Sequence, residues 1–252
     1  MARDGGVQSV ARAVGLVEAL AAAGPLGVSQ LAERADLPTA TVHRLLATLN
    51  EAGWVRRDPV TRRYVAGSGL VRLGMAARAA LGPMVEPALA EVARRTGETA
   101  NYAVLEDDAV TYLAQHESAH MVRMFTEVGN RVAPHATAVG KVLLADRPRQ
   151  DVEALIARTG LPARTPRTIT DPSRLHDALA EVARAGYAVD DEEQELGVRC
   201  VAVPVVAEGR TIAALSVSGP AGRLDADRQQ AAVEVLREAA ARVAEGTGAP
   251  AS

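Results

Sequence analysis

Cysteine, lysine and aromatic residues are scarce in this chain of 252 residues, and each scarcity narrows what the protein can be. Cys200 is the single cysteine, so the chain can form neither an intramolecular disulfide framework nor a thiolate metal cluster, which suits a reducing cytosol. Aromatic residues make up 2% of the chain. Lys141 is the single lysine, so arginine carries nearly all of the positive charge.

Long apolar runs are also missing. No stretch approaches the roughly 18 uninterrupted apolar residues of a membrane span, and Arg12 and Glu18 interrupt the N-terminal segment where a secretion signal would be apolar. We therefore expect a cytoplasmic protein with no membrane partner. At 48% hydrophobic residues the chain can bury substantial cores, and its length favours two domains.

The net charge of −3 is unevenly distributed. Residues 1–74 contain nine arginines and six acidic residues, whereas residues 75–252 contain nineteen basic and twenty-five acidic residues. Four of the nine arginines cluster closely, as Arg56, Arg57, Arg62 and Arg63. Taken alone, such a cluster is typical of a solvated turn, so its position in the fold must decide whether it binds phosphates.

The stretch from Pro38 to about Ala52 has helical periodicity, with an apolar stripe formed by Val42, Leu45, Leu46 and Leu49. The opposite face carries small and hydrogen-bonding residues with one forked cation, namely Ala40, His43, Arg44, Ala47 and Thr48. An ordinary amphipathic helix with a mixed exterior would explain this pattern. The small, polar face would also allow close approach to another surface.

The surrounding elements favour DNA binding. A helix over residues 9–22, a short helix after Ser29 as N-cap and a tight connection at 36–38 precede this helix, and two short strands around Asp58-Pro59 follow it. This order is typical of a winged helix-turn-helix, predicted here for residues 1–66. The predicted DNA-binding residues are Thr39, Ala40, Thr41, His43, Arg44, Thr48, Arg62 and Arg63.

A linker helix is expected at 67–82, followed by a second domain at 83–246 and a flexible tail at 247–252. In the second domain the pattern predicts helices at 84–96, 136–145, 149–158, 172–185 and 225–244. It predicts strands at 99–105, 110–116, 121–127, 187–190, 198–206 and 211–218. The expected fold class is multidomain α+β, with a mainly antiparallel sheet in the second domain.

Tests for catalytic chemistry in the second domain fail. Cys200 lies in a strand pattern with no histidine base assigned to it, so it is interpreted as a buried thiol or a pocket wall. The acidic run from Asp190 to Glu195 is interpreted as a solvated turn, and Ala138 to Lys141 lacks the residues of a phosphate-binding loop. Ser216 and Ser218 share one face of a strand and can donate hydrogen bonds to an anion. We expect no catalytic residues, no metal and no cofactor.

Four ordered segments resemble the IclR family of bacterial transcriptional regulators, over about residues 8–245. The front segments are Ser9 to Ala13 and Thr41 to Leu49, the latter followed by Gly53-Trp54-Val55. The rear segments are Pro134 to Ala145, together with Gly186 to Glu193 and Gly197 to Pro204. The resemblance implies a GAF-like effector domain, homodimers that associate into homotetramers, and binding of double-stranded, pseudo-palindromic operator DNA.

The resemblance also implies an effector pocket. Its residues map onto Met121, Ala138, Val139, Asp190, Cys200, Ser216 and Ser218. This set resembles pockets of the family that sense glyoxylate and pyruvate, although those pockets have smaller residues at the positions of Ala138 and Val139. Backbone N–H groups at the start of the helix at 138 and the two serine hydroxyls would suit a carboxylate. Asp191, Glu192 and Glu193 are interpreted as structural.

The sequence therefore predicts a ligand-responsive transcription factor, not an enzyme, that senses a small organic acid. One alternative is a regulator of the same family that senses an aromatic acid or another larger metabolite. A second is a thiol-dependent hydrolase that uses the rear pocket. A third is a regulator whose rear domain serves only to form oligomers.

Overall fold

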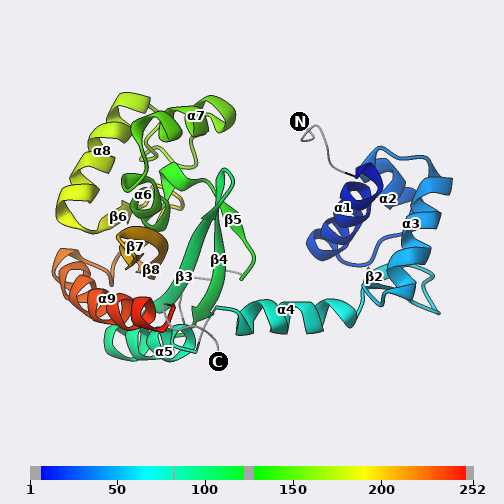
Figure 1. The fold of residues 1–252 in the computed structure, drawn as a ribbon, viewed down its shortest axis with the longest axis horizontal. Coiled ribbons are helices and arrows are strands. Elements are labelled where there is room, and N and C mark those ends of the chain that lie inside the picture. Colours follow the sequence, from blue (N-terminus) through cyan, green and yellow to red (C-terminus); the bar gives the residue numbers. More distant parts are fainter. Residues whose placement is uncertain (1–6, 82, 122–127, 248–252) are drawn as a thin grey trace. The chain divides into compact units, whose positions relative to one another are not determined.

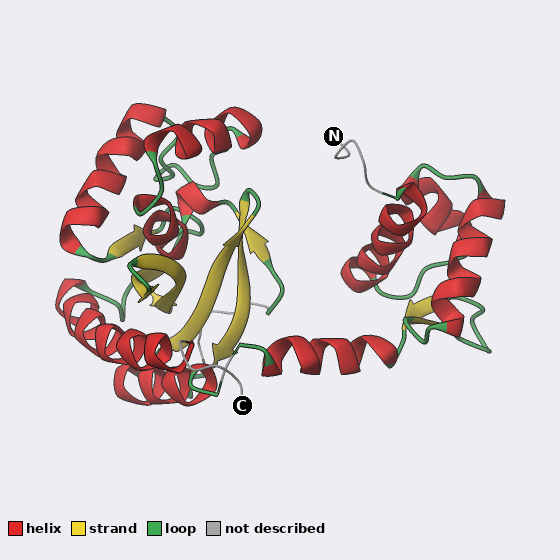
Figure 2. Ribbon diagram, in the orientation of Figure 1, coloured by secondary structure: helices red, strands yellow, loops and turns green. Residues whose placement is uncertain are grey.

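The computed structural model describes residues 7–81, 83–121 and 128–247 (Figure 1). The chain divides into two compact units, Met1–Ala80 and Leu81–Ser252. Figure 2 shows that the first unit is mainly helical, whereas the second combines helices with a large sheet. The predicted multidomain α+β class is therefore confirmed. Within these described residues, no helix combines the length and apolarity needed to cross a membrane.

In the described part of the first unit, three helices are followed by a hairpin and a further helix. Their bounds are α1 Gln8–Ala23, α2 Val28–Ala35, α3 Thr39–Glu51, β1 Val55–Arg57, β2 Tyr64–Ala66 and α4 Gly69–Ala79. The strands pair antiparallel, with Val55 opposite Ala66. Helix α3 buries Val42, Leu46 and Leu49 against the core that α1, α2 and the hairpin complete. The apolar stripe predicted for this helix is thus its buried face.

Helix α2 starts differently from the prediction. Ser29 lies inside the helix, and Gly27 occupies the N-cap position. The Gln30 side chain accepts a hydrogen bond of 3.0 Å from the Gly27 backbone N–H, so a glutamine reaching back replaces the expected serine cap. The predicted N-cap at Ser29 was wrong because the helix begins at Val28, two residues before the position that a Ser29 cap implies.

The second unit is organised around an antiparallel sheet with strand order β5-β4-β3-β8-β7-β6. The strands are β3 Thr99–Glu106, β4 Ala109–His116, β5 Arg131–Val132, β6 Ala188–Asp191, β7 Val198–Ala207 and β8 Arg210–Pro220. The helices are α5 Val85–Thr96, α6 Ala138–Ala145, α7 Arg149–Thr159, α8 Pro172–Ala185 and α9 Ala226–Thr247. The predicted antiparallel sheet is confirmed.

Helices cover both faces of this sheet (Figure 1). Helices α5 and α9 pack on one face, where Leu215 and Val217 of β8 join the largest apolar core. Helix α6 packs on the other face, against alternate residues such as Ala202 and Ala214. Because successive residues of a strand point to opposite faces, Ser216 and Ser218 face α6. Helices α7 and α8 complete a further core around Leu144.

The start of α6 is held by two local features. Pro134–Ala136 form a short 3-10 helix, η1, and Thr137 then caps α6 by accepting a hydrogen bond of 3.1 Å from the Gly140 N–H. A Cβ at Gly140 would lie 2.1 Å from the Pro134 carbonyl oxygen, so only glycine allows this close approach. The helix predicted at 136–145 therefore begins two residues later than expected.

Two other predictions differ from the structure or fall outside it. Most of the strand predicted at 121–127 lies outside the described residues, and the edge strand beside β4 is β5, at Arg131–Val132. The last helix continues to Thr247, which places the first residue of the flexible tail predicted at 247–252 inside α9. Residues 248–252 of that segment lie outside the described residues.

Candidate functional site

The outer face of α3 is open to solvent. Thr39, Ala40, His43, Arg44 and Thr48 are exposed, and Thr41 is partly buried. The Thr48 hydroxyl donates a hydrogen bond of 3.3 Å to the Arg44 carbonyl, and its oxygen keeps its capacity to accept a hydrogen bond. The face that the sequence assigns to DNA thus carries small side chains around one exposed guanidinium, as close approach to base edges requires.

The β1–β2 hairpin forms the wing. The Asp58 carboxylate accepts hydrogen bonds from the backbone N–H groups of Val60 and Thr61 and from the Thr61 hydroxyl, at 2.7 to 3.0 Å. These bonds, the Thr61 backbone bond first, hold the pKa of Asp58 below its usual value. Arg62 has a left-handed backbone, with φ of 60°, and completes the turn. The wing is therefore a defined turn with a cationic tip.

The two wing arginines are both exposed but have different surroundings. Arg63 Nη1 lies 3.5 Å from the carbonyl oxygen of Pro25, which draws its guanidinium towards the α1–α2 connection. Arg57 donates a hydrogen bond of 3.1 Å to the Arg62 carbonyl, and its guanidinium carbon lies 5.6 Å from the centre of the Tyr64 ring. Arg57 thus supports the turn that presents the Arg62 side chain to solvent.

The second candidate site is a buried polar cluster on the sheet face beneath α6. The strand register places Cys200 opposite both Asp190 and Ser218. The same register pairs Ser216 with Ala202 and with Asn101. Four of the predicted effector residues, from three strands, therefore meet on one face. Ala138 and Val139, also predicted, are buried in the apolar core that borders this cluster and includes Cys200.

Asn101 of β3 joins the cluster. Its amide Nδ2 donates hydrogen bonds to the hydroxyl oxygens of Ser216, at 3.3 Å, and Ser218, at 3.2 Å. Its Oδ1 is buried and has no hydrogen-bond partner among the described residues. Sequence reasoning missed Asn101, although a polar residue between Ala100 and Tyr102 in an apolar strand was a signal for a buried amide.

Asp190 is almost fully buried, with 1% of its surface exposed. Its Oδ1 accepts hydrogen bonds from the backbone N–H groups of Glu193, at 2.7 Å, and Gln194, at 3.4 Å. Burial raises the pKa of Asp190 to about 7, against the opposing effect of the Glu193 hydrogen bond. This carboxyl group can therefore be either neutral or ionised near neutral pH.

Cys200 and Tyr112 lie beside Asp190. Burial raises the pKa of the Cys200 thiol, and the Asp190 carboxylate adds to this effect, whereas a hydrogen bond from Ser218 opposes it. Burial likewise raises the pKa of Tyr112. A thiol with a raised pKa stays protonated and is a poor nucleophile. The environment of Cys200 thus suits a pocket wall and argues against a thiol-dependent hydrolase.

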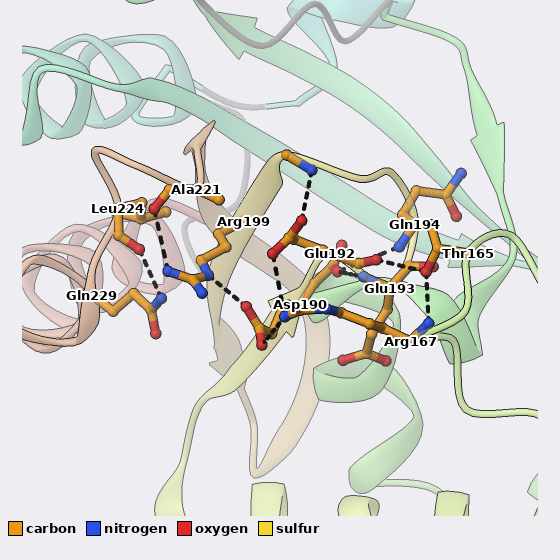
Figure 3. A network of polar contacts seen from close by, with 12 residues as sticks. Thr165, Arg167, Asp190, Glu192, Glu193, Gln194, Arg199, Ala221, Leu224 and Gln229 are labelled. Atoms are coloured by element: carbon orange, nitrogen blue, oxygen red, sulfur yellow. Dashed lines mark hydrogen bonds and ion pairs between the residues drawn. The ribbon is translucent and has the colours of Figure 1, made fainter.

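The acidic run after β6 is structural rather than freely solvated (Figure 3). Glu193 is buried and pairs with Lys141 of α6 at 2.5 Å, and the Thr168 hydroxyl donates a bond of 2.6 Å to the Glu193 carbonyl. Asp191 pairs with Arg199, which lowers the pKa of the aspartate. The interpretation of 190–195 as a solvated turn was wrong for Asp190 and Glu193, because α6 and the 165–168 segment cover them.

Met121 does not join the cluster. Its surface is 97% exposed, so the described position of this residue does not support its predicted place in the pocket. Residues 122–127, which follow it, lie outside the described part of the chain. Within that described part, no group of three or more His, Cys, Asp or Glu side chains is arranged to hold a metal ion.

Two models of one protein family match this chain. Residues 75–245 match the model of the bacterial transcriptional regulator IclR C-terminal domain, and residues 9–59 match the IclR helix-turn-helix domain. The chain belongs to the IclR family of bacterial transcriptional regulators. The IclR-family helix-turn-helix is a DNA-binding element, and α2 and α3 lie within its match.

Full-length relatives support this assignment. The chain is 35% identical over 246 residues to the HTH-type transcriptional regulator BhcR of Paracoccus denitrificans, covering 96% of this chain and 88% of BhcR. An IclR transcriptional regulator from Alicyclobacillus acidocaldarius has a similar structure, with a TM-score of 0.87 and 33% identity over 96% of this chain and all of the other. IclR-family relatives of the present chain are named as transcriptional regulators and not as enzymes.

One related structure contains a small molecule. An IclR homologue from Microbacterium hydrocarbonoxydans was crystallised as a complex with 4-hydroxybenzoate. It matches with a TM-score of 0.83 and 29% identity, covering 95% of this chain and 98% of the homologue. At least one protein of this fold therefore binds an aromatic acid.

Proposed function

We propose that this IclR-family regulator acts in the cytoplasm and binds a pseudo-palindromic operator through α3 and the β1–β2 wing. Arg44 would donate two hydrogen bonds to a guanine edge in the major groove, and His43 and the threonines would contact bases or phosphates. Arg62 and Arg63 would contact the backbone. The exposure of this polar face, opposite an apolar stripe in which Val42, Leu46 and Leu49 are buried, supports the proposal.

We further propose that the buried polar cluster binds a small organic acid of the glyoxylate or pyruvate type. The single observation that carries this proposal is the gathering of Asn101, Ser216 and Ser218 beneath α6, where two buried hydroxyls share one amide donor. The N–H groups of Ala138 and Val139 belong to the first turn of α6, so they have no acceptor within the helix. Helix N-termini of this kind attract carboxylates.

In this proposal α4 is the linker between a DNA-binding domain and an effector domain, and the protein forms homodimers that associate into homotetramers. The effector would shift the balance between two arrangements of the assembly that space the recognition helices differently. Such a shift requires the acid to bind the two arrangements with unequal affinity.

An aromatic acid is the second candidate effector, because the Microbacterium homologue was crystallised with 4-hydroxybenzoate. The side chains of Ala138 and Val139 weigh towards the smaller acid, since both are buried in the core next to Cys200 and occupy space there. The two candidates predict that different acids bind with the higher affinity.

The direct test is fluorescence anisotropy of a labelled DNA fragment from upstream of the protein's own gene, at two salt concentrations. Glyoxylate, pyruvate and 4-hydroxybenzoate are added in turn. We expect tight binding that weakens with salt, as phosphate contacts require, and that one acid changes. Specific binding that no acid alters would refute the effector proposal. If the protein binds specifically neither to this fragment nor to any fragment of a genomic library, the DNA-binding proposal is refuted.

A further inference from the structure

Asn101 has an unusual position for an amide in a strand. Its surface is fully buried, and it sits on the α6 face of β3, directly opposite Ser216. The Nδ2 group lies between two hydroxyls of the neighbouring strand and donates to both of them. Both N–H groups of the amide therefore donate to Ser216 and Ser218.

The opposite orientation of the amide would be costlier. With Oδ1 towards the serines, both N–H donors of the amide would be buried, whereas the observed orientation leaves one buried acceptor, Oδ1, without a partner. A buried polar atom without a partner is destabilising, so the orientation that leaves fewer such atoms is favoured. The observed orientation makes each serine oxygen an acceptor towards Asn101.

This arrangement fixes what the serines can offer to a ligand. A hydroxyl that accepts from Asn101 still has its own O–H to donate. Cys200 lies directly opposite Ser218 in the strand register, and its thiol sulfur is a weak acceptor that a carboxylate oxygen would replace. Both serines therefore present donors, which match the two acceptor oxygens of a carboxylate. A carboxamide would place an N–H donor against one of them.

We propose that Asn101 is a specificity-determining residue, which selects a carboxylate over the matching carboxamide by holding Ser216 and Ser218 as hydrogen-bond donors. This inference rests on the proposed function, since it takes the polar cluster as the effector site. It adds a residue that the predicted pocket did not contain. Asn101→Asp reverses the polarity, because a carboxylate at this position accepts from both hydroxyls and turns their lone pairs towards the ligand.

The test is titration calorimetry on the full chain with two acid and amide pairs, pyruvate with pyruvamide and 4-hydroxybenzoate with 4-hydroxybenzamide. We expect the wild-type protein to prefer the acid of the pair that it binds. In Asn101→Asp the ratio of acid affinity to amide affinity should fall at least about tenfold, the size expected for one charge-assisted hydrogen bond. A residue with a purely structural role would weaken both ligands equally.

Two further variants keep the test decisive. Asn130→Asp adds the same charge at an exposed position of the same unit and should leave the ratio unchanged. Asn101→Thr, which has one hydroxyl donor and suits a strand, replaces Asn101→Asp if the buried charge prevents folding, and should also lower the ratio. Suppose that the Asn101 variants leave the ratio of acid affinity to amide affinity unchanged, while Ser216→Ala with Ser218→Ala abolishes binding. The proposed effector site is then supported, and the proposed role of Asn101 is refuted. If the wild type binds neither pair, both fall together.

Discussion

Lys141 Nζ lies 2.5 Å from Glu193 Oε1, and both side chains are buried, at 5% and 10% exposure. The same ammonium group donates a bond of 2.6 Å to the Val189 carbonyl. The single lysine of the chain thus ties α6 to the segment that carries Asp190, whose Oδ1 accepts from the Glu193 N–H. Lys141, which ends the segment that partly matches a phosphate-binding loop, therefore connects two elements that border the proposed effector site.

Breaking this pair should strongly destabilise the second unit. Lys141→Met leaves the Glu193 carboxylate buried without its partner, which typically costs about 3–5 kcal/mol. The double variant Lys141→Met with Glu193→Leu should recover most of this loss, because apolar replacement of both partners is often neutral. Urea unfolding followed by circular dichroism gives the free energies of unfolding.

The exposed pair between Arg149 and Glu153 provides the control for that experiment, with side chains 72% and 55% exposed. Arg149→Met should change stability by less than about 1 kcal/mol. If Lys141→Met is as stable as Arg149→Met, the buried pair does not stabilise the packing of α6 against the Glu193 segment.

Arg44→Ala should weaken operator binding and relax the preference at one base pair. A bidentate contact to guanine is worth about 1–3 kcal/mol of discrimination, so affinity for the best site should fall by roughly tenfold or more. Anisotropy with operators mutated one base pair at a time measures both effects. Arg184→Ala, at an exposed arginine of α8, is the matched control and should bind normally. An unchanged preference at every position would remove Arg44 from base recognition.

Ser216→Ala combined with Ser218→Ala should abolish the response to the acid while DNA binding persists. The two changes remove both hydroxyl donors of the buried cluster but leave the strands paired. Operator anisotropy with and without the acid measures the response. Ser173→Ala, at an exposed serine in the first turn of α8, should respond like the wild type. A double variant that still responds to the acid would place the effector elsewhere.

Asp190 should make stability depend on pH. Its pKa is about 7 in the folded protein, above the ordinary value of 3.8, so the folded state binds the proton more tightly than the unfolded state. The stabilisation from this proton is complete below about pH 4 and is lost as pH rises through 7. Asp190→Asn keeps an acceptor for the Glu193 N–H, and its stability relative to the wild type should therefore increase between pH 5 and pH 8.

Several groups face Asp190 and must be allowed for in this measurement. Lys141 of α6 favours the ionised carboxyl, Glu193 disfavours it, and Cys200 and Tyr112 lie beside it as neutral groups. Asp177→Asn, at an exposed position on α8, controls for the loss of one acidic residue. If Asp190→Asn and Asp177→Asn show the same dependence of unfolding free energy on pH, the Asp190 carboxyl does not titrate near neutrality.

Local patterns were enough to predict the elements that position the DNA-binding face. The period of Val42, Leu46 and Leu49 predicted which side of α3 is buried, and Asp58-Pro59 predicted the turn of the wing, because both depend on residues close together in the chain. Alternation also predicted strands β3, β4, β6, β7 and β8 of the second unit, but it missed the short edge strand β5, and most of the strand predicted at 121–127 lies outside the described residues.

What the sequence determined by itself was therefore the family, the order of most elements and the buried face of α3. Tertiary structure alone decided that Asn101 meets serines more than a hundred residues away, that Asp190 and Glu193 are buried, and that Met121 is exposed. The physical reason is that strand register and desolvation depend on the segments that pack together from distant parts of the chain, and an acidic run has the same local pattern whether or not a helix covers it.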